Sequence, residues 1–565
     1  MRIAQAALVL LILGCSRELR SGNADYWLEL QTEHFTLRTD LPEGDARKAA
    51  ADLELIRNAL IAARWQARFV SPERIAVTLL ASNAELHEFV QNRLDGYATR
   101  GVFGERLIVA SAQGGLLDSE VVKHELSHVL AQGYLVTDPR WVQEGIACYL
   151  ETLEIDRDTL TATAGSTGAH RRMYLRDREE RIRTYDWADR VMGVGSAQPV
   201  SDGFDFETLS WGLVHWLVDT RPQEFDAFLA SLSQGKTMWS AFDAAFPEVD
   251  EAMLEQEVPS HLFSIGYLPK RTFNVEPWTG EMQVRKLRAS EVYEVRTELV
   301  GTAGDEGMGD WKMKFAFELE RARQADPGNP FVVRLTQDAD PQLAIDAHPD
   351  DYRSWLVWFP AHPSDGASLR KAVELAPSSG QALALLAGFE QQTGRPREAL
   401  GHIEDAARVF PDYRVFNIMA AILQAQDRCP EAAAAEERAL ASLSDGEQPK
   451  LQLDLRMRLE SIVSRCEQLN VPVSELEATP LLGCRQQADR TGGIGNGTFA
   501  KFTVGEDGRT SSVAIRGLND VHRVGSVRAF VESCRFKPPL LDGKPHAVQL
   551  DLAVVRLKPA MAPGG

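Results

Sequence analysis

Two histidines and a glutamate in residues 121–130, VVKHELSHVL, have the types and the spacing that metal chemistry requires. Positions four apart lie on one face of an α-helix, about one turn from each other. His124 and His128 can therefore point imidazole nitrogens at one ion, while Glu125 can hold a water molecule beside it. The alternative is an ordinary amphipathic helix whose histidines make only internal hydrogen bonds. The apolar residues expected to bury this helix are Val121, Val122, Leu126, Val129 and Leu130.

A second helix is expected soon after the histidines, in residues 138–151, DPRWVQEGIACYLE. Asp138 fits the N-cap and Pro139 the first helical position, so a short loop should return the chain here. Glu144 then lies between one and two turns inside the helix and is able to face the histidine helix. Because a catalytic zinc site needs a third protein ligand and an open fourth position, Glu144 is the candidate for that ligand.

The segments HELSH and PRWVQEGIACYLE together resemble the motifs of gluzincin metallopeptidases of the peptidase-MA-like group, over about residues 26–262. In that family the glutamate of a Trp-x-x-Glu-Gly motif is the third zinc ligand, and Glu144 occupies this position. The resemblance implies an α+β metallopeptidase domain that holds one Zn²⁺ with His124, His128 and Glu144. It also implies that Glu125 acts as general base on the zinc-bound water and carries the proton to the leaving amine of a peptide bond.

Other residues near the motifs are weaker candidates for roles in this site. The resemblance implies a donor for the oxyanion, and His215, Tyr149 and Tyr134 are the nearest in sequence. For His215 the alternative is a core histidine with internal hydrogen bonds. Glu151 could orient a ligand imidazole or could be a solvated surface carboxylate. Cys148, one turn beyond Glu144 on the same face, could approach the metal, whereas the alternative that we expect is a small core residue.

Hydrophobic periodicity predicts the elements that position these residues. A strand near Leu107–Ala110 is expected to form the sheet edge before the histidine helix, where an extended peptide could add as a further strand. The expected elements are strands within residues 34–40 and 74–81, a pair of strands within 101–112, helices within 45–63 and 209–220, and a long loop within 154–207.

After a Pro-, Gly- and Thr-rich stretch at residues 263–282, the chain is expected to become helical and repetitive. Residues 380–413 resemble a tetratricopeptide repeat, and residues 414–447 follow the same plan more loosely. Such arrays bind partners on a concave face, whereas the alternative is an unspecific helical bundle. The matching residues of the first repeat are Leu386, Ala387, Gly394, Ala399, Ile403, Ala406 and Pro411.

The last segment, residues 474–560, resembles the C-terminal domain of TonB-type energy transducers. The resemblance lies in an alternating hairpin around Asp507-Gly508 and in the later run Arg535–Pro538. The inner-membrane helix and Pro-rich spacer of a transducer are not recognised in the sequence. The resemblance therefore implies a small binding or docking module rather than energy coupling.

The first residues, MRIAQAALVLLILGCS, predict export to a bacterial envelope. The apolar run Ala6–Leu13 follows Arg2 and is too short to span a bilayer. Residues 12–15 resemble a lipobox, in which Cys15 would be lipidated, and Ser16 resembles the outer-membrane sorting signal. The alternative is a secretory signal that is removed together with Cys15.

Export permits disulfides, and two pairs are expected because each lies within one predicted domain: Cys429 with Cys466, and Cys484 with Cys534. The formal net charge of −20 argues against a nucleic-acid partner, because such a surface repels phosphate.

A chain of 565 residues exceeds the size of a single core, so we expect a multidomain protein. The predicted function is a lipid-anchored envelope zinc metallopeptidase, facing the periplasm, whose later domains bind protein substrates or partners. The alternative is a catalytically silent scaffold in which those domains mediate protein–protein interaction. The predicted parts are a signal peptide (1–14), a tether (15–25), the metallopeptidase domain (26–270), a linker (271–286), the helical array (287–470) and the C-terminal domain (474–560).

Overall fold

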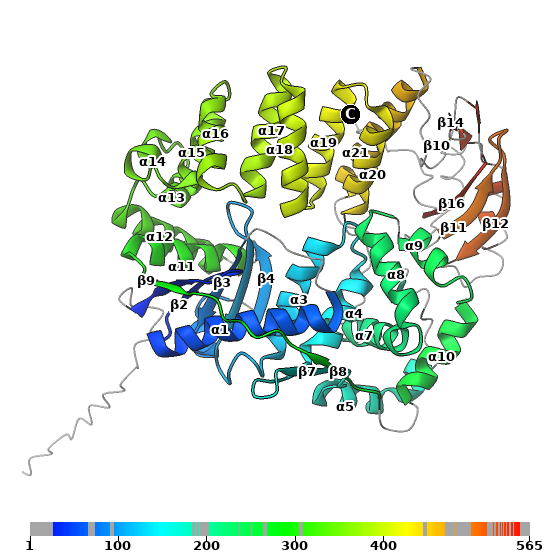
Figure 1. Ribbon diagram of the computed structural model, residues 1–565, viewed down its shortest axis with the longest axis horizontal. Helices are drawn as coiled ribbons and strands as arrows, with labels where there is room; N and C mark the ends of the chain where they lie inside the picture. The colour runs from blue at the N-terminus through cyan, green and yellow to red at the C-terminus, as the bar shows by residue number, and fades with distance from the viewer. Residues whose placement is uncertain are drawn as a thin grey trace, which may run out of the picture.

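The computed structural model shows a multidomain protein of mixed α and β structure, described from residue 26 to residue 553 with interruptions. Figure 1 shows an α/β domain, a helical array lying over one end of it, and small sheets beside the last helices. The predicted signal peptide, the tether with Cys15, and Cys484 lie outside the described residues. The internal gaps are residues 66–73, 91–94, 184–186, 188–190, 193–202, 237, 250, 264–267, 304–308, 444–448, 469–478, 481–498, 517–523, 525–526, 529–530, 533, 535, 538–539, 542–543 and 546.

A six-stranded mixed sheet forms the centre of the first domain, in the order β4-β5-β3-β2-β1-β9. β2 with β3 and β3 with β5 pair in parallel, and the other neighbours pair antiparallel. The strands expected at residues 34–40 and 74–81 are confirmed as β2 and β3. The strands are β1 (Leu28–Gln31), β2 (Phe35–Thr39), β3 (Ile75–Leu80), β4 (Gly96–Arg100), β5 (Arg106–Ser111) and β9 (Gln283–Lys286).

The edges of the sheet are β4 and β9, so the prediction that Leu107–Ala110 forms an edge is wrong. That segment belongs to β5, which lies between β3 and β4. The segment GYATR was not predicted as a strand, but it pairs antiparallel with β5 through the turn at residues 101–105. The pair of strands expected within residues 101–112 is therefore wrong, because that range holds β5 alone. Among the strands of the described residues, β4 pairs with β5 alone.

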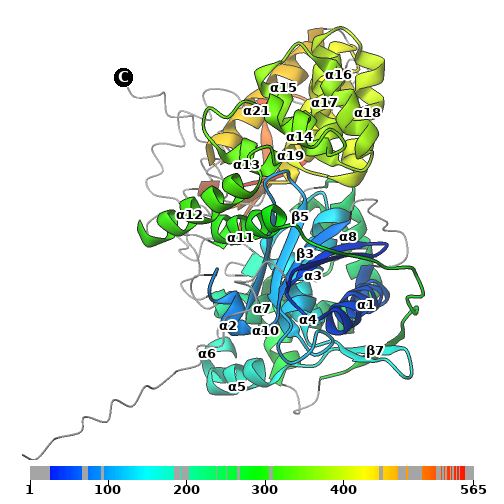
Figure 2. The same ribbon diagram turned by 90° about the vertical axis from the view of Figure 1, so that its left-hand side faces the viewer.

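Helices cover both faces of this sheet (Figure 2). Alternate side chains of β3 and β5 enter two apolar cores, since Val77 and Ile108 point to one face and Leu80 and Leu107 to the other. The first core is enclosed by α1 (Glu43–Leu60), α3 (Glu120–Tyr134), α4 (Arg140–Glu151), α7 (Gly203–Thr220), α8 (Pro222–Ser233), α9 (Met238–Ala245) and α10 (Glu251–Phe263). The second core lies under α2 (Asn83–Leu86), α11 (Ala289–Ala303) and α12 (Gly309–Ala325).

Two stretches expected to be irregular contain regular structure. Residues 271–286, predicted as a linker, contain β8, which pairs with β7, and β9, which pairs with β1. The stretch is therefore part of the first domain, because its pairing partners are distant in sequence and local patterns do not reveal them. The expected long loop within 154–207 contains β6 (Glu154–Asp156), β7 (Thr161–Ala164), α5 (Ala169–Asp177) and α6 (Glu179–Arg183), and β8 is Arg271–Asn274.

The array consists of helices that pack against their sequence neighbours, notably α17 on α18 and α19 on α20. Small buried residues, including Ala387, Ala399 and Ala420, allow this close approach. Among helices of the described residues, none is both long and apolar enough to cross a membrane. The helices are α13 (Pro330–Leu335), α14 (Gln342–Ala347), α15 (Tyr352–Ala361), α16 (Gly366–Leu375), α17 (Gly380–Gln392), α18 (Pro396–Val409), α19 (Tyr413–Ala425), α20 (Cys429–Ala441) and α21 (Pro449–Gln468).

The cysteines differ from the prediction in one of the two pairs. Cys429 is a free thiol, fully buried in the apolar core of the array, so its expected disulfide with Cys466 is not formed. The physical reason is that the thiol packs as a small apolar side chain at the start of α20. Cys534 is disulfide-bonded, and its predicted partner Cys484 lies outside the described residues.

The C-terminal segment forms a three-stranded antiparallel sheet in the order β12-β11-β16. The expected hairpin at Asp507-Gly508 joins β11 to β12, and Gly508 has the positive φ of 72° that such a turn favours. Its elements are β11 (Phe499–Val504), β12 (Thr510–Arg516) and β16 (Val548–Ala553), with short pairs formed by β10 (Thr479–Pro480), β13 (Phe536–Lys537), β14 (Leu540–Leu541) and β15 (Lys544–Pro545).

The turn between β4 and β5 inserts into the helical array. Phe103 at its tip is only 3% exposed and packs in one core with Phe331, Leu356 and Leu369. Arg106 donates a hydrogen bond of 3.0 Å from Nη2 to the carbonyl oxygen of Val409 at the end of α18. The array therefore holds the end of the edge strand of the first domain.

Candidate metal centre

The histidine helix α3 forms as its sequence predicts. The Ser119 hydroxyl caps it by accepting a hydrogen bond of 3.2 Å from the backbone N–H of Val122. Its apolar positions, among them Leu126 and Val129, are buried in the first core. Since the buried face is fixed, His124 and His128 lie one turn apart on the adjoining, half-buried face.

The second helix, α4, begins one residue later than expected. Its N-cap is Pro139, so Asp138 does not cap it and Pro139 is not the first helical residue. Gly145 allows α4 to lie very close to α7, because a Cβ there would be 2.5 Å from the carbonyl oxygen of Ser210. The close packing on α7 sets the position of the neighbouring Glu144 on the face toward α3.

The three predicted ligand atoms converge. The Nε2 atoms of His124 and His128 are 3.0 Å apart, and Glu144 Oε2 lies 3.6 Å from each of them. Two ligands of a tetrahedral zinc ion, each about 2.0–2.1 Å from the metal, are ~3.4 Å apart. The spacing and the chemistry of two imidazoles and a carboxylate thus fit a zinc ion.

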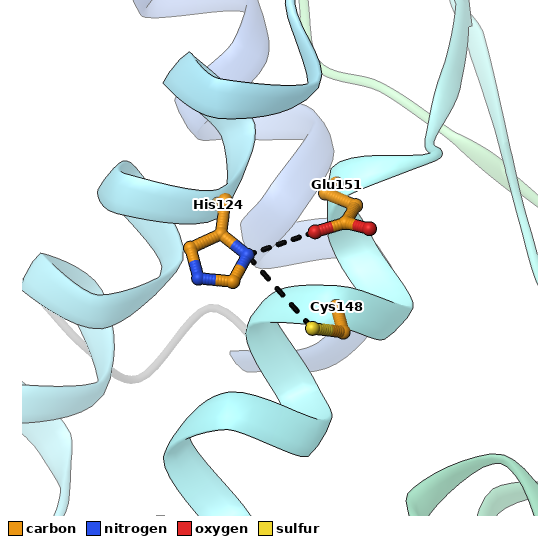
Figure 3. A group of neighbouring side chains, drawn as sticks. All are labelled: His124, Cys148 and Glu151. Carbon is orange, nitrogen blue, oxygen red and sulfur yellow. Dashed lines mark hydrogen bonds and ion pairs between the residues drawn. The ribbon is translucent and has the colours of Figure 1, made fainter. Parts of the chain in front are cut away.

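Glu151 lies on the other nitrogen of the first histidine, as Figure 3 shows. Its Oε2 is 2.8 Å from His124 Nδ1, and its Oε1 is 2.8 Å from Nη1 of the buried Arg171. A carboxylate that accepts from Nδ1 directs the lone pair of Nε2 toward an ion. This geometry agrees with an orienting role for Glu151 and not with a solvated surface carboxylate.

Cys148 completes an alternative ligand set on the same side, but its chemistry fits a metal less well. Its Sγ is 4.0 Å from His124 Nδ1, beside Glu151 (Figure 3). The residue is fully buried, and burial raises the pKa of its thiol to about 11, which keeps it neutral. Metal ligands must be deprotonated, so the Nε2 side of His124 is the better site. Cys148 is the small core residue that was expected.

The two histidines differ in their electrostatic surroundings. Burial disfavours the charged form of His124, but hydrogen bonds with Cys148, Glu144 and Glu151 outweigh it and raise its pKa well above the ordinary value. Burial and the neighbouring His124 lower the pKa of His128 to about 4. An ion bound between the two Nε2 atoms would therefore have to displace a proton from His124.

Glu125 connects the site to the sheet edge. Burial raises the pKa of its carboxyl group, although the charge of His124 and a hydrogen bond from the backbone N–H of Ala98 oppose this. Ala98 is the central residue of β4. The carboxylate therefore lies between the candidate metal ligands and the edge strand, with proton affinity above that of an exposed glutamate.

The residues considered for oxyanion stabilisation are placed elsewhere. His215 is fully buried on α7, where its Nδ1 faces Asp219 and His261, so it is the core histidine of the alternative prediction. The ring of Tyr149 packs edge-on against His215, on the face of α4 opposite to Glu144. Tyr134 is the last residue of α3 and is half-buried.

Two residues of the site were missed by sequence reasoning. Arg171 on α5 pairs with Glu151, although it lies in the stretch that was expected to contain a long loop. Glu207, in the first turns of α7, is near enough to Glu144 that burial and this neighbouring charge raise its pKa. Neither residue has a local signal, because both reach the site from segments that only the tertiary fold brings close.

Comparisons with known proteins cover the part of the chain that carries this site. The sequence model of a family described as "Protein of unknown function (DUF1570)" matches residues 119–238. The match spans α3, α4 and α7, and hence all three candidate ligands and Glu125. No curated protein matches the sequence.

Proposed function

We propose that this protein is a zinc-dependent peptidase whose metal is held by His124, His128 and Glu144. The observation that carries the proposal is the convergence of three ligand atoms, separated by 3.0–3.6 Å, beside the carboxylate of Glu125. This arrangement agrees with the gluzincin resemblance of the two motifs, which places the same residues in the same roles.

The chemistry follows from the positions of the side chains. A zinc ion at this site would acidify a bound water and polarise the carbonyl of the scissile bond. Glu125 would accept the proton of such a water and would deliver it to the leaving amine, for which its raised pKa is suited. Glu151 holds His124 in the ligating tautomer, and Arg171 keeps Glu151 ionised and in place.

The edge strand β4 is the proposed binding site for an extended peptide. Among the described strands it pairs only with β5, so its outer side can accept an added strand. The bond from Ala98 N–H to Glu125 puts this strand next to the general base. A peptide lying along β4 would thus present its backbone to the metal centre.

The other domains are proposed to choose and position protein partners. The array has helical hairpins with buried small residues, which supports a tetratricopeptide-like arrangement. The three-stranded C-terminal sheet with its hairpin supports a TonB-like docking module. With the lipobox-like N-terminus, the whole chain would be an outer-membrane lipoprotein that acts in the periplasm.

The decisive experiment measures bound metal and peptide hydrolysis on the chain that starts after Cys15. Wild type and Glu125→Gln should both hold zinc at the centre, whereas only wild type should cleave a mixed peptide library. Loss of a general base lowers the rate by about 10²–10⁴-fold. Glu120→Gln, at the exposed first position of α3, is the matched control and should retain full activity.

The possible failures have different meanings. Equal cleavage by Glu125→Gln and wild type would refute the role of Glu125. Metal binding without cleavage by either protein would favour the silent scaffold. If His128→Ala binds as much zinc as wild type, the proposed ligands are wrong.

A further inference from the structure

A second group of ligand-type side chains lies beyond α4 from the metal centre. His215 and Asp219 are four residues apart on α7, and His261 is near the end of α10. As in the first centre, the spacing of the α7 pair puts both side chains on one helix face. The proposed peptidase chemistry uses none of the three residues.

The ligand atoms of this group have the separations of a metal site. His215 Nδ1 lies 3.1 Å from His261 Nε2 and 3.2 Å from Asp219 Oδ2, and the remaining separation is 3.5 Å. These distances bracket the ~3.4 Å expected between ligands of a tetrahedral zinc ion.

The hydrogen bonding of His215 favours a ligand rather than a donor. Its Nε2 faces the carbonyl oxygen of Gly165 at 3.4 Å, a contact that the ring can make only with a proton on Nε2. In the neutral tautomer that has this proton, Nδ1 carries the lone pair, and Nδ1 lies 3.2 Å from Asp219 Oδ2. Metal-bound histidines in proteins commonly donate the other ring N–H to a backbone carbonyl in this way.

Asp219 is a buried carboxylate in need of positive charge. Its side chain is 5% exposed, yet neither oxygen accepts a hydrogen bond of good geometry. The nearest cation is Arg271, whose Nε is 3.7 Å from Oδ1 and does not lie among the histidines. A carboxylate at such a depth with one long ion pair and no hydrogen bond is costly, and its Oδ2 lies near two imidazole nitrogens.

We propose that His215, Asp219 and His261 form a second metal site that binds a divalent transition ion of the zinc class. Two imidazoles with one carboxylate suit zinc and disfavour magnesium and calcium, which prefer oxygen ligands. His261, with 14% of its side chain exposed, is the ligand nearest to solvent, so water would occupy the fourth position on its side. The ion would tie α10 to α7 and would take no part in peptide hydrolysis.

The test counts zinc ions per chain by native mass spectrometry after dialysis against zinc-buffered solution. A double variant of the first centre, His124→Ala with His128→Ala, removes the proposed catalytic ion. We expect this variant to retain one zinc ion per chain and to retain none once His261→Ala is added. His362→Ala, in the array, is the matched control and should leave the count unchanged.

This design separates the second site from the proposed function. If the first centre binds no zinc, wild type holds one ion and His261→Ala holds none, and the second site still stands. Should the first-centre variant hold no zinc, or should adding His261→Ala leave its count unchanged, the second site is wrong. Zinc-edge X-ray absorption tests the second site without a substitution in it. The spectrum of the first-centre variant, in which α7 and α10 are intact, should show two imidazole ligands. A spectrum without imidazole would equally overturn the proposal.

Discussion

Replacing Glu151 by glutamine tests how the metal centre is supported. The carboxylate lies between His124 Nδ1 and Arg171 Nη1, at 2.8 Å from each. Glutamine keeps the shape but removes the charge that orients the imidazole. Loss of such an outer partner weakens metal binding by about 10–100-fold. Since each tenfold is ~1.4 kcal/mol, Glu151→Gln should lose ~1.4–2.8 kcal/mol of zinc-binding free energy.

The substitution also has a structural cost that must be measured separately. Arg171 is 4% exposed, and a buried charge deprived of its partner destabilises a protein by about 3–5 kcal/mol. We therefore expect the melting temperature of metal-free Glu151→Gln to fall. The double variant Glu151→Gln with Arg171→Met should recover much of this stability but not the zinc affinity, because the orienting charge is still missing.

Zinc affinity is measured by competition with a chelator at neutral pH, and stability by calorimetry of the metal-free protein. Glu154→Gln, an exposed glutamate just after α4, is the control and should change neither quantity by more than a small amount. We expect the zinc affinity to fall at least ~10-fold. If Glu151→Gln lowers the melting temperature but changes the zinc affinity by less than about threefold, Glu151 serves only to neutralise Arg171.

Phe103→Ala should destabilise the protein by about 3–5 kcal/mol, because it leaves a cavity in the core between the β4–β5 turn and the array. The rate of amide hydrogen exchange should then rise in β4. An unchanged rate in β4 would show that the array does not hold the strand. Gly145→Ala should lower the free energy of unfolding by about 1–3 kcal/mol, since its Cβ would lie 2.5 Å from the Ser210 carbonyl oxygen. Calorimetry measures this, and an unaltered melting temperature would contradict the close packing of α4 on α7. Burial raises the pKa of the fully buried Glu436 carboxyl to about 7. The unfolded chain loses this proton above about pH 4.5, so the free energy of unfolding should fall between pH ~4.5 and ~7 and stay at the lower value above that. Glu436→Gln should accordingly be more stable than wild type by about 3 kcal/mol at pH ~8, because each pKa unit is worth ~1.4 kcal/mol, and equal to it near pH ~4; a difference independent of pH would refute the titration.

Features that depend on one continuous segment could be predicted from the sequence. His124 and His128 share a face because any α-helix puts residues four apart side by side, whatever packs around it. Glu144 could be named because a short loop returns the chain only a few residues later. The helical hairpins of the array follow from local spacing for the same reason.

The partners of these residues were decided by the tertiary structure. Arg171 reaches Glu151 and Ala98 reaches Glu125 because separate segments meet, and no periodicity in either segment encodes the contact. The sheet edge was assigned to the wrong strand for the same reason, since an edge is defined by what fails to pair with it. His215 was considered for the first centre by its type and its nearness in sequence, which do not reveal where its side chain lies.

The sequence by itself thus placed His124 and His128 on one helix face, and it named Glu125 and the helix of Glu144 as candidates for a metal centre. Only the tertiary structure decided which face of α7 His215 occupies and that His261, from another helix, lies 3.1 Å from it. Short-range helical geometry is set by the backbone, whereas contacts across the core depend on how whole elements pack. The second site could therefore be recognised only in the tertiary structure.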